Sequence, residues 1–306
     1  MMKVTLLSGG VGGARASRGF DSVLGSDELT IVVNVGDDDR IHGVHVSADI
    51  DTVLYTLADR EGPQGWGIAG DTFTAMDRLA ASGQDTRFRL GDADLAFCID
   101  RTKALDAGER LSSVVARTAV VLGITRHVLP VTDGTLRTRI QTSAGEWLAF
   151  QDYFVLRGHR DEVAAVEYTG AGLTKPAPGV LDAISGADLV VIAPSNPPLS
   201  VWPILAVPGV RDALARARRV IAVSPLFAGI ALKGPAHRVM ASLGLPAGNA
   251  GVLVAYQGLL TDLVVDVDDA ADVARLSGDV VIHAVDTRIT RRVDAARLAS
   301  FIMGLT

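Results

Sequence analysis

Short apolar runs alternate with segments of helical spacing along most of the chain. In the first part, the runs Lys3–Leu7 and Leu29–Val35 flank a helical pattern at Ala14–Leu24; later, Leu189–Ile192 and Val220–Val223 are again apolar at every position or nearly so. Continuous apolar runs of this length are typical of strands buried on both faces of a parallel sheet. The alternation of such strands with helices predicts an α/β fold with a doubly wound, Rossmann-like, mostly parallel sheet.

The middle of the chain has a different pattern. Arg137–Ile140 and Glu146–Val155 alternate between apolar and polar residues, as strands of an antiparallel hairpin do. We therefore predict an inserted α+β region at residues 71–175, on the substrate side. The Rossmann-like nucleotide-binding core is then formed by residues 1–70 and 176–306.

Composition and charge argue against a protein that binds nucleic acid, depends on disulfides, is secreted or spans a membrane. The 306 residues are 48% hydrophobic, carry a net charge of −6 and show no basic stripe, which argues against nucleic acid as a partner. The single cysteine, Cys98, excludes an intrachain disulfide and favours a reducing compartment. The chain opens on a strand-like run rather than a signal peptide, so the expected location is the cytoplasm. The uncharged stretch Leu189–Val210 contains five prolines, which predicts a strand and loop instead of a membrane span.

A glycine-rich loop, Ser8–Arg15, lies between the first strand and the first helix. Glycines such as Gly10 and Gly12 let backbone N–H groups approach phosphate oxygens at a helix N-terminus. The spacing lacks the third glycine of the dinucleotide fingerprint, and no Walker lysine follows. A tight turn without any ligand is the alternative.

An acidic segment follows the second strand. It comprises Asp37–Asp39, with Asp49 and Asp51 a few residues further on. Carboxylates gathered near a phosphate loop need a countercharge, and Mg²⁺ characteristically binds one or two carboxylates together with substrate phosphates. The alternative is that Asp49 or Asp51 caps the predicted helix Thr52–Ala58. Capping accounts for one aspartate but not for five.

Polar residues also follow two later strands. Ser195 and Asn196 come just after Leu189–Ile192, and Ser224 follows Val220–Val223. An α/β sheet binds ligands beyond the carboxyl ends of its strands, so these loops are expected to hold a nucleotide.

Taken in order, these segments resemble the 2-phospho-L-lactate transferases. The similarity is collinear from Lys3 to about Tyr256, and the ordered set is more specific than any single motif. The motifs that carry it include Leu7-Ser8-Gly9-Gly10-Val11-Gly12-Gly13-Ala14-Arg15, Asn34-Val35-Gly36-Asp37-Asp38, Asp49-Ile50-Asp51-Thr52, Arg89-Leu90-Gly91-Asp92, Pro194-Ser195-Asn196-Pro197 and Lys233-Gly234-Pro235.

The resemblance implies a Mg²⁺-dependent transferase of coenzyme F420 biosynthesis, expected to be a homodimer. Such enzymes move a phosphorylated three-carbon acid from a guanosine-diphosphate-linked donor to the deazaflavin 7,8-didemethyl-8-hydroxy-5-deazariboflavin (FO) and release GMP. Whether the acid is lactate, enolpyruvate or glycerate stays open, because the residues that select it cannot be identified from the sequence.

The resemblance also assigns roles to residues. Arg89 stands where some relatives have lysine, and Trp202 stands beside the nucleotide loop where glycine is common. The implied assignments are Asp37 and Asp51 for catalysis, Asp37, Asp49 and Asp51 for the metal, Asp51 and Arg89 for the deazaflavin, and Gly10, Gly12, Ser195 and Asn196 for the guanosine diphosphate portion.

Two other functions fit parts of the pattern. A nucleotide-sugar-binding regulator of the same fold would share the glycine loop and Ser195-Asn196. An NAD(P)-dependent oxidoreductase would share the opening strand–helix–strand unit, although the acidic run Asp37–Asp39 argues against it. Neither alternative predicts deazaflavin binding.

Overall fold

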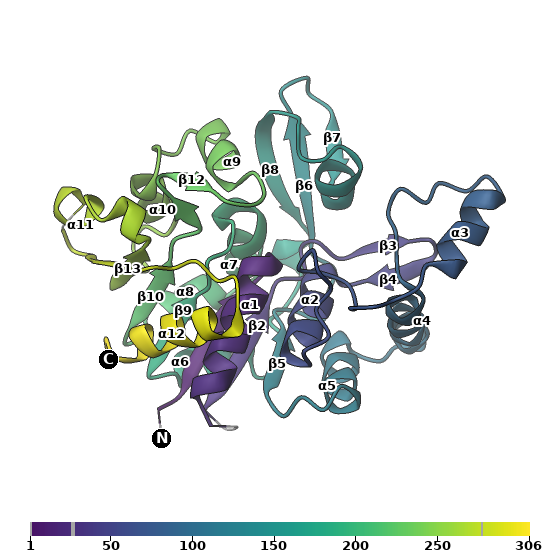
Figure 1. Cartoon of the computed structure of the whole chain (residues 1–306), viewed down its shortest axis with the longest axis horizontal. Helices are drawn as coiled ribbons and strands as arrows, with labels where there is room; N and C mark the ends of the chain where they lie inside the picture. Colours follow the sequence, from purple (N-terminus) through teal and green to yellow (C-terminus); the bar gives the residue numbers. More distant parts are fainter. Residues whose placement is uncertain (1, 26–27, 277) are drawn as a thin grey trace.

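A seven-stranded, entirely parallel sheet forms the centre of the protein in the computed structural model, which describes residues 2–25, 28–276 and 278–306 (Figure 1). The strand order is β14-β13-β10-β9-β1-β2-β5. The predicted doubly wound α/β fold is confirmed. The strands are β1 (Val4–Ser8), β2 (Leu29–Val33), β5 (His127–Pro130), β9 (Leu189–Ile192), β10 (Val220–Val223), β13 (Asp262–Val265) and β14 (Val281–Ala284).

The chain leaves β1 in both directions across the sheet. It runs first through β2 to β5 and then returns to the other side of β1 for β9, β10, β13 and β14. The point where the order reverses lies between β1 and β9, and such a switch point is where doubly wound sheets bind their ligands.

Helices cover both faces of the sheet. Parallel crossovers are right-handed, so the helices that connect the strands of one half lie on the face opposite to those of the other half, whereas α12 follows the last strand and packs on the face of α1. On one face α1 packs against α2 and α12, and on the other α8 packs against α6 and α7. The helices are α1 (Gly10–Val23), α2 (Ala48–Leu57), α3 (Thr74–Ala81), α4 (Asp92–Asp106), α5 (Leu111–Val121), α6 (Val180–Ser185), α7 (Trp202–Ala206), α8 (Val210–Ala215), α9 (Ala236–Ser242), α10 (Asn249–Ala255), α11 (Asp272–Arg275) and α12 (Arg292–Met303).

The core consists mainly of aliphatic side chains from the sheet. Leu6, Val191 and Ile221 on three adjacent strands are completely buried and paired in register. Each fully buried aliphatic side chain of this kind contributes roughly 1.5–3 kcal/mol relative to an exposed one. This rigid centre fixes the positions of the loops that follow β1, β2 and β9.

The middle region is only partly separate from the core. β6 (Arg137–Thr142), β7 (Trp147–Ala149) and β8 (Val163–Thr169) form their own antiparallel sheet, as the hairpin pattern predicted. The predicted second strand, however, ends at Ala149, because the chain continues into a π-helix at Asp152–Leu156. β5 and α5 lie within residues 71–175 but belong to the central sheet and its helical layer. The domain boundaries themselves stay a prediction.

Smaller elements connect these parts. An antiparallel hairpin, β3 (Asp39–Ile41) with β4 (Val44–Val46), extends from the end of β2 towards α3 and α4 at the edge of the molecule (Figure 1). A second short pair joins β11 (Leu226–Phe227) to β12 (Ile230–Ala231). The remaining turns are a π-helix at Pro197–Val201 and 3-10 helices at Ala171–Leu173 and Val267–Asp269.

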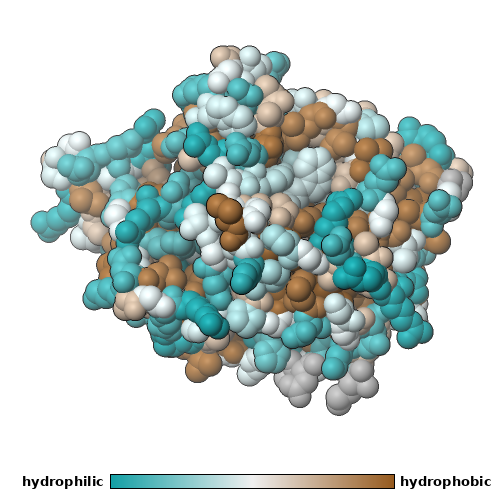
Figure 2. Space-filling view, turned by 180° about the vertical axis from the view of Figure 1, so that it is seen from behind, coloured by the Kyte–Doolittle hydropathy of each residue, from teal (hydrophilic) through white to brown (hydrophobic). Residues whose placement is uncertain are grey.

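The surface carries no continuous apolar belt on the face seen in Figure 2, where hydrophilic residues are interspersed with smaller hydrophobic patches. Within the described ranges, none of the helices has both the length and the apolar character that a membrane crossing requires.

Candidate functional site

The glycine loop after β1 meets the loop after β9 at the switch point. The Ser195 hydroxyl donates a hydrogen bond of 2.7 Å to the carbonyl oxygen of Gly9. A Cβ placed on Gly12 would overlap the carbonyl oxygen of Pro194, and Gly10 has a φ of 65°, in the left-handed region that favours glycine. The structure therefore brings together Gly10, Gly12 and Ser195, and their role in binding a nucleotide stays a prediction.

Gly12→Ala is expected to destabilise the protein by about 1–3 kcal/mol, because the added methyl group must push the Pro194 carbonyl aside. Thermal unfolding checks this, with Gly172→Ala as the matched control, since a Cβ on Gly172 would meet nothing within 4 Å. An equal melting temperature for the two variants would show that the loops are not in this close contact.

Asn196 lies next to Ser195 in the loop after β9, and only the oxygen of its side-chain amide is hydrogen-bonded within the described residues. Its Oδ1 accepts a hydrogen bond of 3.3 Å from the backbone N–H of Leu199, which orders the following π-helical turn. Its Nδ2 donates to no other residue in the described part of the chain. The indole N–H of Trp202, at the start of α7, donates a hydrogen bond of 3.0 Å to the carbonyl oxygen of Ala255.

Asp49 caps a helix, but not its own. Its Oδ1 accepts a hydrogen bond of 2.8 Å from the backbone N–H of Gly10, at the first turn of α1, and its Oδ2 accepts one of 2.9 Å from the Asn34 amide. At the start of α2, Ser47 is the N-cap residue and makes no side-chain capping bond. The alternative that Asp49 caps the helix in which it lies is therefore wrong, because Asp49 caps α1 and not α2. Burial raises the pKa of Asp49 to about 6, against the lowering effect of these two donors.

Asp37 and Asp38 are buried carboxylates with unsatisfied oxygens. Both side chains are nearly inaccessible, and the Oδ1 atom of each lacks a hydrogen-bond partner within the residues that the structure describes. The other oxygen of Asp38 accepts hydrogen bonds from Ser47 Oγ at 2.8 Å and interacts with His45 Nε2 at 3.0 Å. Burial, followed by repulsion from Asp49, raises the pKa of Asp37 well above its ordinary value. The sequence singled out Asp38 only as one member of the acidic run, but like Asp37 it has a buried oxygen without a hydrogen-bond partner among the described residues.

Asp51 has a buried arginine as its partner. Arg101 on α4 forms an ion pair with both carboxylate oxygens, one of them at 3.0 Å from Nη1. Burial raises the pKa of Asp51, and the guanidinium opposes that rise. Sequence reasoning missed Arg101, because a single arginine in a helix 50 residues away gives no signal of its partner.

The three predicted metal carboxylates do not form one tight group. Among the described residues, the one set of at least three potential ligands whose atoms all lie within 4.8 Å of each other is Asp51, Asp94 and Cys98. The pKa of Asp94 is raised to about 7 by burial and by Asp51, and the Tyr55 hydroxyl donates to it at 2.8 Å. Arg101 contacts Asp51 directly, so this set already has a cation. The assignment of Asp37, Asp49 and Asp51 to a metal stays a prediction.

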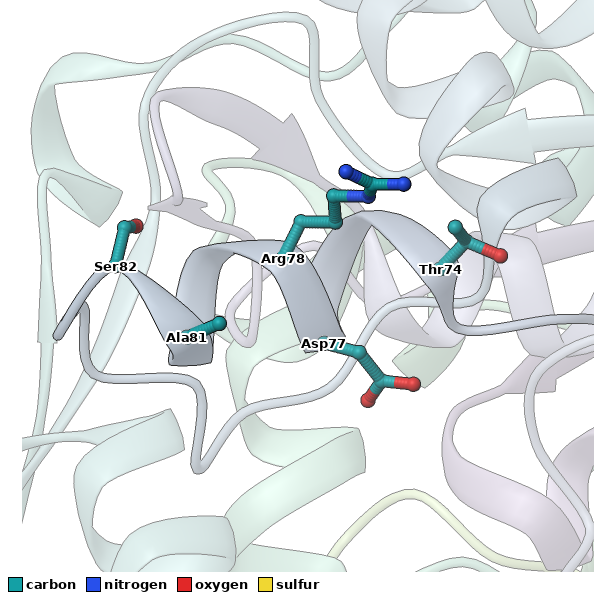
Figure 3. Close-up of a pocket in the computed structure, with 5 residues that line it drawn as sticks. All are labelled: Thr74, Asp77, Arg78, Ala81 and Ser82. Atoms are coloured by element: carbon teal, nitrogen blue, oxygen red, sulfur yellow. The ribbon is translucent and has the colours of Figure 1, made fainter.

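Arg89 lies on the outer lobe formed by α3 and α4. Its guanidinium pairs with Asp77 at 2.6 Å and lies 5.0 Å from the centre of the Phe73 ring. The side chains of Arg89 and Asp77 are both substantially exposed to solvent. The adjacent surface of α3 has a hollow of about 550 Å³ lined by Thr74, Asp77, Arg78, Ala81 and Ser82 (Figure 3). No contact joins Arg89 to Asp51 among the described residues, and its deazaflavin role stays a prediction.

The aspartates beside Arg89 have a structural function. Asp92 accepts hydrogen bonds of 3.0 and 2.9 Å from Thr74 and Ala75 at the start of α3. Asp71 in turn accepts bonds from the backbone N–H groups of Ala93 and Asp94 at the start of α4. The two helices are thus capped reciprocally, which fixes the α3–α4 lobe.

Comparison with known proteins decides the family. Residues 4–296 match the model of the family described as 2-phospho-L-lactate transferase CofD. The chain belongs to this family. The resemblance seen in the sequence motifs is thereby confirmed, over nearly the whole chain.

Relatives of this CofD-family chain carry two names. It is 35% identical over 304 residues to a 2-phospho-L-lactate transferase of Methanocaldococcus jannaschii, covering 98% of this chain and 97% of the relative. It is 38% identical over 306 residues to a phosphoenolpyruvate transferase of Streptomyces coelicolor, covering 97% and 96%. A crystal structure of a UPF0052 family member from Bacillus halodurans superposes with a TM-score of 0.68 at 17% identity, covering 98% of this chain and 99% of that one, and supports the fold alone.

Proposed function

We propose that this CofD-family chain transfers a phosphorylated three-carbon acid from a guanosine-diphosphate-linked donor to FO, releasing GMP and forming the core of coenzyme F420. The observation that carries the proposal is the buried acidic cluster, Asp37, Asp38 and Asp49, beside the glycine loop at the switch point. The names of the relatives support 2-phospholactate or phosphoenolpyruvate as the transferred group.

The donor's diphosphate is proposed to bind between the loops that follow β1 and β9. Backbone N–H groups at the start of α1 and the free amide of Asn196 suit phosphate oxygens. Asp49, however, already occupies the N–H of Gly10. A phosphate arriving there would be repelled by this carboxylate, and so the site requires a cation.

Mg²⁺ fits the residues present. The unpartnered Oδ1 atoms of Asp37 and Asp38 are hard oxygen donors, and they are buried where an uncompensated charge is costly. We propose that Asp37 and Asp38 hold the ion, with Asp49 and Asp51 as the other predicted candidates. Bound there, Mg²⁺ would neutralise charge on the phosphate oxygens during transfer.

The protein's own residues then act mainly by positioning. Asp51, anchored by Arg101, is the proposed contact to the acceptor, whose terminal ribityl hydroxyl it orients by accepting a hydrogen bond. Asn34 holds Asp49, and Ser47 and His45 hold Asp38, so each carboxylate has a fixed direction. Phosphoryl transfer demands little covalent chemistry from a protein, and alignment of the reacting groups supplies much of the rate.

Binding and turnover with FO test the function. FO is titrated by fluorescence, and Mg²⁺ is then added with the lactate-, enolpyruvate- or glycerate-bearing guanosine diphosphate donor in turn. Mass spectrometry follows GMP and the extended deazaflavin, and we expect product from one donor that disappears with EDTA. If FO does not bind under any of these conditions, the transferase proposal is wrong, and a nucleotide-sugar-binding regulator becomes the better explanation. Light scattering on the same sample tests the expected homodimer.

A further inference from the structure

Arg101 is the largest of the charged side chains that the structure buries almost completely. It has 2% of its surface exposed, projects from α4 and reaches the first turn of α2. Its Nη1 and Nη2 each bond to one oxygen of Asp51. A guanidinium that spans both oxygens of a carboxylate fixes the carboxylate's plane as well as its position.

Arg101 also connects Asp51 to the acidic cluster. Nη1 donates a second hydrogen bond of 3.2 Å to the carbonyl oxygen of His45. The imidazole of that histidine lies 3.0 Å from Asp38. Arg101 therefore fixes the position of Asp51 relative to strand β4. The side chain of His45 in that strand orients Asp38.

Stability alone does not account for this arrangement. Removing two charges from water costs several kcal/mol per ion, and well-packed apolar residues often replace a buried ion pair without loss. The Nε–H of Arg101 adds a further cost, since it is buried and has no acceptor within the described residues. The guanidinium fixes the orientation of the Asp51 carboxylate, which an apolar side chain at this position could not do.

We propose that Arg101 is a positioning residue, which holds Asp51 in the orientation needed to contact the acceptor. The inference rests on the proposed function. It assigns a role to a residue that lies outside the sequence motifs shared with the 2-phospho-L-lactate transferases. Arg101 acts through Asp51 and does not itself touch the substrate. Lysine would retain the charge but not the fork that spans both oxygens.

The experiment is a double-mutant cycle on the full-length chain with Arg101→Met, Asp51→Asn and the double variant, together with Arg101→Lys. For each, kcat, the KM for FO and the KM for the donor are measured per folded protein, alongside the melting temperature. We expect Arg101→Met to lower kcat/KM for FO by about 100-fold, the effect of misplacing a reacting group by ~1 Å, while the KM for the donor changes less than about twofold. Arg101→Lys should recover part of this loss.

Non-additivity distinguishes positioning from an independent role. If Arg101 acts through Asp51, the double variant is no less active than Asp51→Asn alone. Arg126→Met is the structural control, because Arg126 is also a largely buried arginine paired with an aspartate, Asp21, but lies just before β5 at the other end of the sheet. It should lose stability and keep its kinetic constants.

Two results would overturn the proposal: wild-type kinetics in folded Arg101→Met, or losses that multiply in the double variant. Should Arg101→Met not fold, Arg101→Lys and the double variant still decide, since neither leaves Asp51 as an unpaired buried charge. Absence of product from the wild type and the Arg126→Met control alike would instead refute the proposed function, and the positioning role with it.

Discussion

Replacing Asp37 with asparagine is expected to lower kcat by about 10²–10³-fold while raising the melting temperature of the metal-free protein. The activity falls because a buried, unpartnered carboxylate oxygen proposed to hold Mg²⁺ is lost. The stability rises because burial and the neighbouring Asp49 both disfavour the charge on Asp37, and asparagine carries none. Steady-state kinetics and thermal unfolding in EDTA measure the two effects.

The gain in stability should depend on pH. The pKa of Asp37 is higher in the folded chain than its ordinary value of 3.8, so the folded state binds more protons than the unfolded state above that value. The wild type therefore loses stability as pH rises through the folded pKa, and Asp37→Asn does not. The difference in melting temperature should be small near pH 3.5 and should grow towards neutrality. A difference that shrinks with rising pH would contradict this account.

Mg²⁺ provides the complementary measurement. A ligand that binds only the folded state adds about 2.7 kcal/mol of stability at 100 times its Kd. We expect Mg²⁺ to raise the melting temperature of the wild type and to have little effect on Asp37→Asn. Asp39→Asn is the matched control, with the same change in charge at a less buried position where the carboxylate bonds to the N–H of Arg40. It should respond to Mg²⁺ as the wild type does.

The same substitution at Asp51 should have the opposite effect on stability. Asp51→Asn leaves the guanidinium of Arg101 buried without its counter-charge, and breaking a buried ion pair in this way typically costs 3–5 kcal/mol. Denaturant unfolding of the two variants side by side measures the contrast. Activity should fall in both.

A stabilised Asp51→Asn protein would mean that Arg101 is not a true partner of this carboxylate. The comparison has an internal control, because both variants remove one negative charge from a buried aspartate within 14 residues of each other in the sequence. The charged neighbours differ, because Asp51 is paired with Arg101 whereas Asp37 is repelled by Asp49 and Asp38. The sign of the stability change therefore reports whether a cation is built into the protein at that position.

Much of the architecture could be predicted from the sequence. Strands such as Leu189–Ile192 were identified at their observed bounds, because a fully apolar run of four residues next to turn residues is a local signal. The glycine-rich segment does join the first strand to the first helix, but the prediction of a loop up to Gly13 was wrong, because α1 begins at Gly10 and not at Ala14. The predicted strand up to Val155 was wrong after Ala149, because the chain leaves the sheet there and buries Tyr153 from a π-helix at Asp152–Leu156.

Partners within the site were decided by the tertiary structure. The sequence placed Asp37, Asp49 and Asp51 in one short segment and suggested a shared role, and it offered capping of their own helix as the alternative. The fold separates them: Asp49 caps α1, Asp51 pairs with Arg101, and Asp37 keeps a buried oxygen without a partner among the described residues. The physical reason is that hydrophobic periodicity and turn chemistry act between near neighbours along the chain, whereas these bonds join residues 39 and 50 positions apart that only the packing of α2 against α1 and α4 brings together.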